Sequence, residues 1–149
     1  MKKILLLLVI GLFLSGCATE SLSTLSTLQR RSIEAKELEG NFDDAFKATL
    51  QVLQDKGYVI KSTDYKAGVI QGETGEKDKG WWTYYRYEVT ATIEQFGEDQ
   101  VKERITFLKK SGTEGLVATT SKIIEDPKFL QEIYGAIQKE MFVRKNLNK

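Results

Sequence analysis

The chain has 149 residues, with 22 basic and 21 acidic side chains, one cysteine and no histidine. This near-neutral charge leaves no strong field to hold nucleic acid, and one cysteine cannot form a disulfide within the chain. Without histidine, His-based catalytic triads and histidine metal sites are excluded. The sequence therefore predicts no nucleic-acid partner, no metal and no cofactor, and its length suits one domain with a core.

The N-terminus has the pattern of a secretory signal peptide. Lys2 and Lys3 precede an eleven-residue apolar run over residues 4–14, and small residues follow. A transmembrane anchor is the alternative, but a spanning helix needs roughly 20 apolar residues. A core helix fits poorly, because the run follows two lysines and precedes a polar stretch.

The segment Leu14-Ser15-Gly16-Cys17 resembles the lipobox of bacterial lipoproteins. The resemblance implies a signal peptide over residues 1–16, lipid on Cys17 and attachment to a membrane through that lipid. In a Gram-negative host, Ala18 after the cysteine, in place of aspartate, implies an outer-membrane location that faces the periplasm.

Residues 17–29 are rich in serine and threonine, with leucines at intervals of three. This composition favours a flexible tether between the lipid and the domain. The alternative is a short helix that docks on a partner. The single domain is then expected over residues 30–149, and its first strand over residues 30–38, where apolar and polar residues alternate.

The clearest predicted element is a helix that begins after Asn41, a residue type that caps helix N-termini. Asp44 stands at the capping-box position, and apolar residues recur at helical spacing as far as Leu53. Gly57 is placed to end the helix.

The rest of the chain predicts five strands and a second helix. Residues 75–80 are expected to form a charged loop, and Asp126 and Pro127 are expected to open a helix with a frayed tail after Val143. The order of elements predicts an α+β domain, with an antiparallel sheet of five or six strands and two helices on one face. The five strands are expected over residues 58–63, 69–74, 81–96, 100–110 and 116–124.

Residues 46–72 resemble the repeated domain of BamC-type outer-membrane lipoproteins and of small bacterial lipoproteins. The shared features are an aromatic-led helix that ends in glycine, a strand, the Asp64–Gly68 segment and the next strand. The closing helix after Asp126 is also similar. The resemblance implies a helix-grip-like fold, in which a curved antiparallel sheet holds a helix, and an envelope protein as partner.

The strand over residues 81–96 is rich in aromatic residues. Alternation places Tyr85 and Tyr87 on the predicted core face and puts Trp82, Tyr84 and Arg86 on the opposite face. These three residues are the candidate partner-binding site, since exposed aromatic clusters anchor proteins or stack on sugars. The alternative is that they pair across strands. The lysines and arginine at positions 102, 104, 109 and 110 are expected to be solvated.

No catalytic motif is present. Residues 72–80 lack phosphate-loop spacing, residues 64–68 lack calcium-loop ligands, and no Gly-x-Ser-x-Gly elbow occurs. The sequence therefore predicts no enzyme. It predicts a lipid-anchored accessory or scaffold that contacts another envelope protein. The alternative is a lipid- or small-ligand-binding module that faces the periplasm, with a cavity between sheet and helix.

Overall fold

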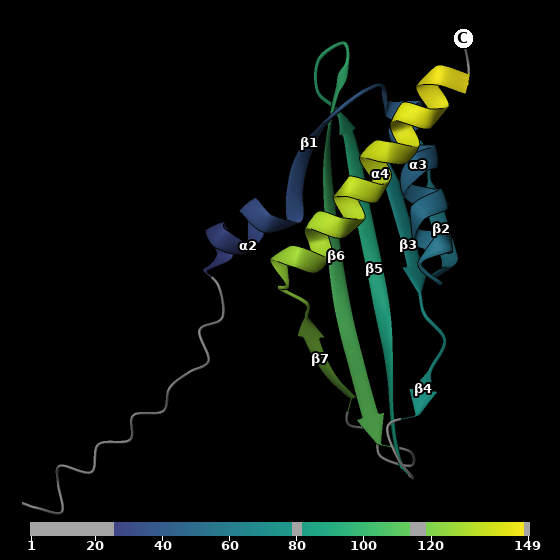
Figure 1. The fold of residues 1–149 in the computed structure, drawn as a ribbon. Coiled ribbons are helices and arrows are strands. Elements are labelled where there is room, and N and C mark those ends of the chain that lie inside the picture. Colours follow the sequence, from purple (N-terminus) through teal and green to yellow (C-terminus); the bar gives the residue numbers. More distant parts are fainter. Residues whose placement is uncertain (1–25, 79–81, 114–118, 148–149) are drawn as a thin grey trace, which may run out of the picture.

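A computed structural model describes residues 26–78, 82–113 and 119–147. They form three helices and one antiparallel sheet, which confirms the predicted α+β class (Figure 1). The helices are α2 (Thr27–Glu34), α3 (Phe42–Asp55) and α4 (Pro127–Leu147). The strands are β1 (Ala35–Glu39), β2 (Val59–Asp64), β3 (Val69–Glu73), β4 (Lys77–Asp78), β5 (Thr83–Gln95), β6 (Gln100–Thr113) and β7 (Thr119–Ile123).

The sheet is built around the long hairpin of β5 and β6. Its strand order is β1-β6-β5-β3-β2, with β4 beside the start of β5 and β7 beside the end of β6. Helices α3 and α4 contact each other and lie on one face, as expected (Figure 1). The predicted loop over residues 75–80 is wrong in part, because β4 pairs with Tyr84 and Tyr85 of β5.

The prediction for residues 30–38 is wrong in its first half. Residues 27–34 form α2, and the strand begins only at Ala35. Ser26 caps this helix by accepting from the backbone N–H of Gln29, whose side chain accepts from the N–H of Ser26. This reciprocal capping box stabilises the start of α2. The last residues of the expected tether therefore belong to a helix, and residues 17–25 lie outside the described part.

Helix α3 confirms its prediction closely. The side chain of Asn41 accepts from the N–H of Asp44 at 2.8 Å and donates to the Asp44 carboxylate at 2.8 Å. The helix ends before Gly57, whose φ of +85° suits glycine best. Helix α4 runs to Leu147, four residues beyond the expected end. The ion pair of Arg144 with Glu140 at 3.0 Å supports this last turn.

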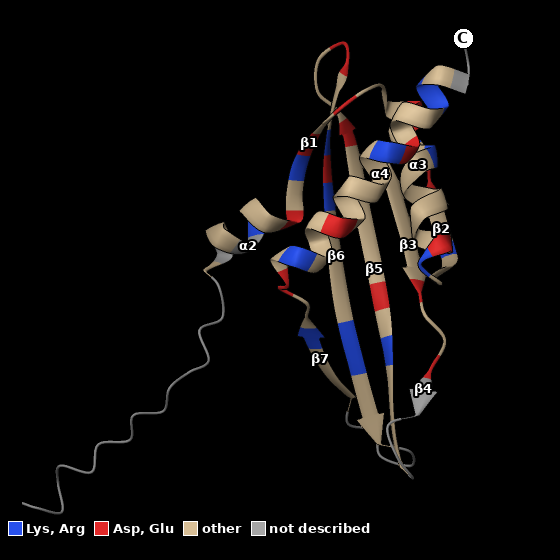
Figure 2. Cartoon of the chain, viewed as in Figure 1, with Lys and Arg blue, Asp and Glu red and all other residues tan. Residues whose placement is uncertain are grey.

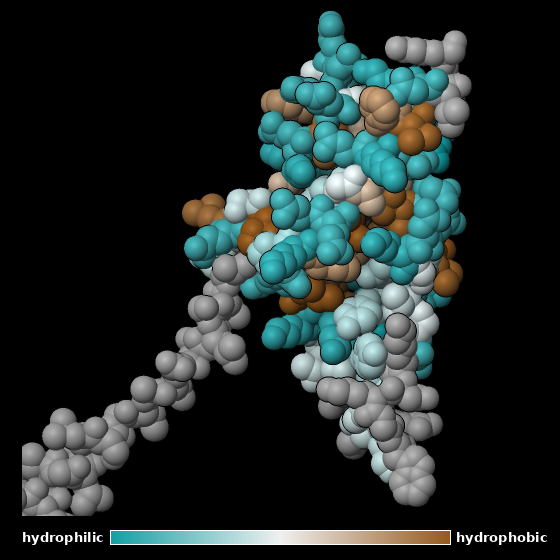
Figure 3. All heavy atoms as spheres, in the orientation of Figure 1, coloured by the Kyte–Doolittle hydropathy of each residue, from teal (hydrophilic) through white to brown (hydrophobic). Residues whose placement is uncertain are grey.

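One hydrophobic core lies between the helices and the sheet. Hydrophilic side chains cover most of the helix side, and hydrophobic ones show between them (Figure 3). The core is continuous from β1 to α4, and of the described hydrophobic residues before β1 only Ile33 packs against it. The buried hydrophobic residues are Leu38, Ala45, Phe46, Ala48, Val52, Leu53, Tyr58, Ile70, Val89, Ala91, Ile93, Val101, Ile105, Phe107, Leu130, Ile133, Tyr134, Ile137 and Met141.

Strand β6 also carries a carboxyl group into this core. Glu103 is 0 % exposed, on the same face as Val101 and Ile105. Burial raises the pKa of Glu103 to about 8, against a smaller opposing contribution from the Thr49 hydroxyl. Oε2 of Glu103 has no hydrogen-bond partner among the described residues.

The Thr49 hydroxyl is the polar neighbour of the Glu103 carboxyl group in the core. Thr49 Oγ1 lies 2.7 Å from Glu103 Oε1 and 2.8 Å from the Ala45 carbonyl oxygen. A threonine hydroxyl has one hydrogen, and a carbonyl oxygen only accepts. Both contacts are therefore hydrogen bonds when the hydroxyl donates to Ala45 and the protonated carboxyl group donates to the hydroxyl.

Candidate functional site

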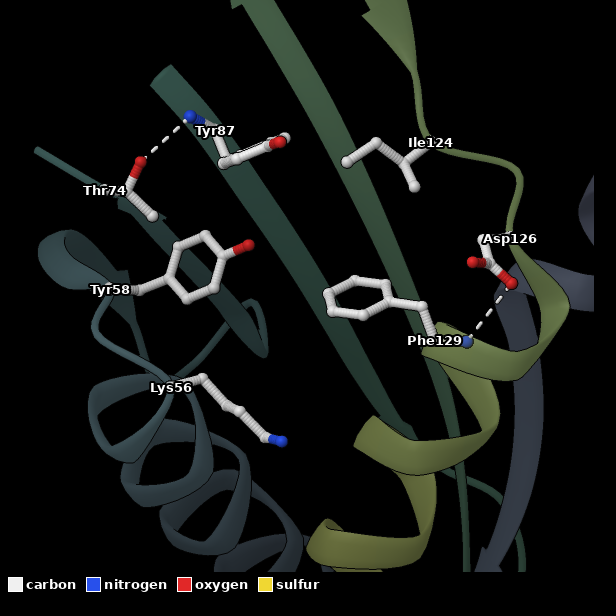
Figure 4. A pocket seen from close by; sticks show the side chains of 7 residues that line it. All are labelled: Lys56, Tyr58, Thr74, Tyr87, Ile124, Asp126 and Phe129. Carbon is white, nitrogen blue, oxygen red and sulfur yellow. Dashed lines mark hydrogen bonds between the residues drawn. The ribbon is translucent and has the colours of Figure 1, made fainter. Parts of the chain in front are cut away.

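A pocket of about 400 Å³ opens on the helix-covered side of the sheet. It lies between the end of α3, the start of α4 and the first half of β5 (Figure 4). Its volume falls within the range of small-molecule sites. Its lining residues are Lys56, Tyr58, Thr74, Tyr87, Ile124, Asp126 and Phe129.

Aromatic rings form the inner wall of the pocket. Phe107 is 0 % exposed, and its ring centroid lies 5.7 Å from that of Tyr58 and 4.9 Å from that of Phe129. Tyr87 faces the same space from β5 (Figure 4). The rings of Tyr58, Tyr87 and Phe129 line the pocket and offer flat apolar surfaces to a ligand, while the buried Phe107 supports two of them.

The hydroxyl groups of Tyr58, Thr74 and Tyr87 add polarity inside the pocket. The Tyr58 hydroxyl points toward the space between Tyr87 and Phe129 (Figure 4). Burial raises the pKa of Tyr58 to about 12, so its hydroxyl stays protonated at neutral pH. Thr74 Oγ1 accepts from the Tyr87 N–H at 3.0 Å, and the Thr74 N–H donates to the Tyr87 carbonyl at 2.8 Å. This pair of bonds fixes the position of Tyr87.

Two lysines lie at the pocket and beside it. Lys56 follows the end of α3, and its ammonium group points toward the open space (Figure 4). On β6, Lys109 Nζ lies 4.9 Å from the ring centroid of Tyr85 and 5.9 Å from that of Tyr87. These distances are typical of cation–π contacts, so Tyr85 and Tyr87 hold the charge of Lys109 beside the pocket.

Asp126 is the acidic lining residue, and it caps α4 as the sequence predicts. Its Oδ1 accepts from the N–H groups of Lys128 at 3.0 Å and Phe129 at 3.4 Å. The positive end of the helix dipole therefore stabilises this carboxylate. By the same contacts, Asp126 fixes the backbone that carries the Phe129 ring.

The predicted partner-binding residues fall into different surroundings. Trp82 precedes β5 and is 63 % exposed. Tyr84 packs over Gly112, where an added Cβ would meet the Tyr84 hydroxyl oxygen at 2.6 Å. Arg86 lies 3.5 Å from Glu76 and 3.4 Å from Glu88 in two ion pairs. Contact with a partner through these three residues stays a prediction, and only Trp82 is broadly exposed.

The predicted core face of β5 holds for half of the strand. Val89, Ala91 and Ile93 are buried beneath the helices, but Tyr85 and Tyr87 are only half-buried. Lys109 is half-buried over the two tyrosines and Lys110 is half-buried in its ion pair with Glu88, so both are less solvated than expected. The helices do not reach this end of the sheet, and the pocket occupies the uncovered space.

A cavity between sheet and helix is an alternative in the sequence analysis, but no residues are assigned to it there. Tyr58 is placed in a strand, and Phe129 is not singled out. The sequence does carry a signal for the pocket, because an aromatic residue, Tyr58, follows the first helix and another, Phe129, lies at the start of the last helix. Glu103 is missed too, although Val101, Glu103 and Ile105 alternate in a core register.

The described residues hold neither a membrane-spanning helix nor a metal-binding cluster. None of the helices in residues 26–147 combines the length and the apolar character needed to cross a membrane. No group of three or more acidic or cysteine side chains is placed to hold a metal within the same part of the chain. Cys17, the predicted site of lipidation, lies outside the described residues.

Comparisons with known proteins find similarity at the level of structure and none at the level of sequence. No protein-family model matches the sequence, and no curated protein matches it. Among solved structures, the chain is similar to a bacterial protein, a DUF4468 family member from Bacteroides ovatus. The two are 12 % identical with a TM-score of 0.40, over 72 % of this chain and 84 % of the other. This likeness carries no functional information.

Proposed function

We propose that this chain is a lipid-anchored, non-enzymatic protein of a bacterial envelope whose domain binds a small ligand. The pocket between α3, α4 and β5 carries the proposal. It combines a volume of about 400 Å³ with aromatic walls and few polar groups, the usual character of small-molecule sites. The BamC-like and lipobox resemblances support an envelope location and a helix-grip-like domain.

Contact with another envelope protein is less well supported. Of its three candidate residues, Tyr84 is packed on the sheet and Arg86 is held by two carboxylates. Trp82 alone offers a broad apolar surface. The absence of histidine from the whole chain supports a binding protein over an enzyme.

Ligand binding is tested with N-phenyl-1-naphthylamine, a neutral dye that fluoresces when it enters an apolar site. The chain from residue 18 to 149 is expected to bind one dye with a dissociation constant of roughly 10–100 µM, as for other ligands of this size. In Ile124→Trp, the indole ring fills the pocket, and binding should weaken at least about tenfold.

Ile123→Trp is the matched control. Ile123 pairs with Leu108, whose neighbour Phe107 faces the core, so residue 123 points to the outer face of the sheet. This variant is expected to bind the dye like the parent chain. Circular dichroism checks that both variants fold. Absence of saturable binding, or equal binding by the parent chain and folded Ile124→Trp, would contradict the proposal.

Membrane attachment is tested by replacing Cys17. In the native host, the full chain of residues 1–149 is expected to incorporate an alkyne-labelled palmitate and to sediment with membranes. Cys17→Ser removes the thiol that would receive lipid, so the label should be lost completely. Label that persists in Cys17→Ser would show that lipid is attached elsewhere, and an unlabelled parent chain would exclude lipidation.

A further inference from the structure

The lysines of the sheet differ in their partners on its two faces. On the outer face, Lys61 lies 2.8 Å from Glu73, and Lys110 lies 2.8 Å from Glu88. On the helix side, Lys109 lies over tyrosine rings. Within the described part of the chain, no carboxylate lies within 4.0 Å of the ammonium groups of Lys109 or Lys56.

Several basic residues lie at the same end of the sheet as the pocket, together with acidic residues of β5 and of the segment before α4 (Figure 2). Basic residues mark the second half of β6 and the neighbouring β7 (Figure 2). Lys122 of β7 is the register partner of Lys109, and paired residues project to the same face of a sheet. The carboxylate in the pocket lining is that of Asp126, and two backbone N–H groups already engage it.

We propose that the pocket selects an anion, a small molecule with a ring-shaped apolar body and one negatively charged group between Lys56 and Lys109. This inference rests on the proposed function and adds the class of ligand. The aromatic walls receive the ring system, because Tyr58, Tyr87 and Phe129 present flat apolar surfaces. The two lysines neutralise the negative group at the rim, where water still reaches it.

The contact between Lys109 and its tyrosines supports this role. A lysine over aromatic rings keeps its full charge, whereas a lysine in an ion pair is already neutralised. Tyr87 both lines the pocket and holds Lys109, so the cation lies at the border of the cavity. Lys56 approaches the pocket from the end of α3 (Figure 4). An anion at the rim therefore meets charges from two elements.

Two dyes with the same ring skeleton test the inference. 8-Anilinonaphthalene-1-sulfonate is N-phenyl-1-naphthylamine with an added sulfonate, so the pair differs by one negative charge. Lys56→Gln and Lys109→Gln are each expected to weaken binding of the sulfonate dye about threefold, and the double variant about tenfold. Binding of the neutral dye should change less than about twofold in all three variants.

Lys102→Gln is the matched control for charge. Lys102 is exposed on the outer face of β6, opposite Glu94, and its loss lowers the net charge equally. Neither dye should bind this variant differently from the parent chain. Ile124→Trp should weaken binding of both dyes at least about tenfold, which would place the sulfonate dye in the pocket.

The outcomes separate the two proposals. If the neutral dye binds but neither lysine substitution changes the dissociation constant of the sulfonate dye, the anion preference is wrong and the pocket proposal stands. If neither dye binds, both proposals fall. If the sulfonate dye binds Ile124→Trp as well as the parent chain, it occupies another surface, and the anion assignment to this pocket is wrong.

Discussion

Replacing Glu103 with glutamine is expected to raise the free energy of unfolding at pH 8 by several kcal/mol. The folded chain keeps the Glu103 carboxyl group protonated up to a pKa of about 8, whereas an exposed glutamate ionises near 4.5. Between these values the folded state binds more protons than the unfolded state, so stability falls as pH rises. The loss is on the order of 4 kcal/mol by pH 8, at 1.36 kcal/mol per pKa unit.

Glutamine imitates the protonated acid, since its amide group donates to Thr49 Oγ1 and carries no charge. Urea unfolding of the parent chain and Glu103→Gln at pH 5 and pH 8 measures the effect. The free energies of unfolding of the parent chain and Glu103→Gln should differ little at pH 5 and by several kcal/mol at pH 8. The exposed Glu94→Gln serves as control and should change stability by less than about 0.5 kcal/mol. An equal effect of Glu103→Gln at both pH values would mean that Glu103 is ionised in the folded chain.

Gly68→Ala is expected to destabilise the domain by more than about 3 kcal/mol. Gly68 ends the turn between β2 and β3 with a φ of +65°, which costs an alanine roughly 1 kcal/mol. An added Cβ would also lie 2.0 Å from the carbonyl oxygen of Ile93. The Ile93 N–H donates to the Gly68 carbonyl at 2.8 Å, so the turn cannot move away without breaking this bond. Thermal and urea unfolding measure the loss.

Gly57→Ala separates backbone strain from steric overlap. Gly57 has a φ of +85°, but an added Cβ meets nothing within 4 Å. This variant should therefore lose only about 1 kcal/mol. Equal free energies of unfolding for Gly68→Ala and Gly57→Ala would contradict the close approach of the β2–β3 turn to β5.

Local signals explain which elements the sequence predicts well. Helix α3 has a capping residue at Asn41, an apolar stripe and a terminal glycine, and all three act within a few residues. Helix α2 carries a capping box from Ser26 to Gln29, but serine-rich surroundings and the alternation after Arg30 hid it. Its end is fixed from a distance, because the Tyr134 hydroxyl donates to the Glu34 carbonyl and accepts from the Ile105 N–H at 3.2 Å.

The pocket depends on lengths that no local pattern contains. Strand β5 has 13 residues and extends about 43 Å, whereas the 14 residues of α3 extend about 21 Å. Because the helices cannot cover the whole hairpin, Tyr85 and Tyr87 remain half-buried although their register continues that of Val89. Tyr58 and Phe129 meet Phe107 there from distant parts of the sequence. The alternation predicts which face they share but not how far the helices reach.

Mapping N-phenyl-1-naphthylamine on the domain by ¹H–¹⁵N NMR tests the binding site most directly. Saturable shifts are expected at the backbone amides of Tyr58, Tyr87, Ile124 and Phe129, which surround the pocket from four elements or their ends. Amides of the outer face, such as those of Arg86 and Lys110, should move less. Shifts centred on Trp82 and Arg86, or no saturable shifts at all, would contradict a ligand site between the helices and the sheet.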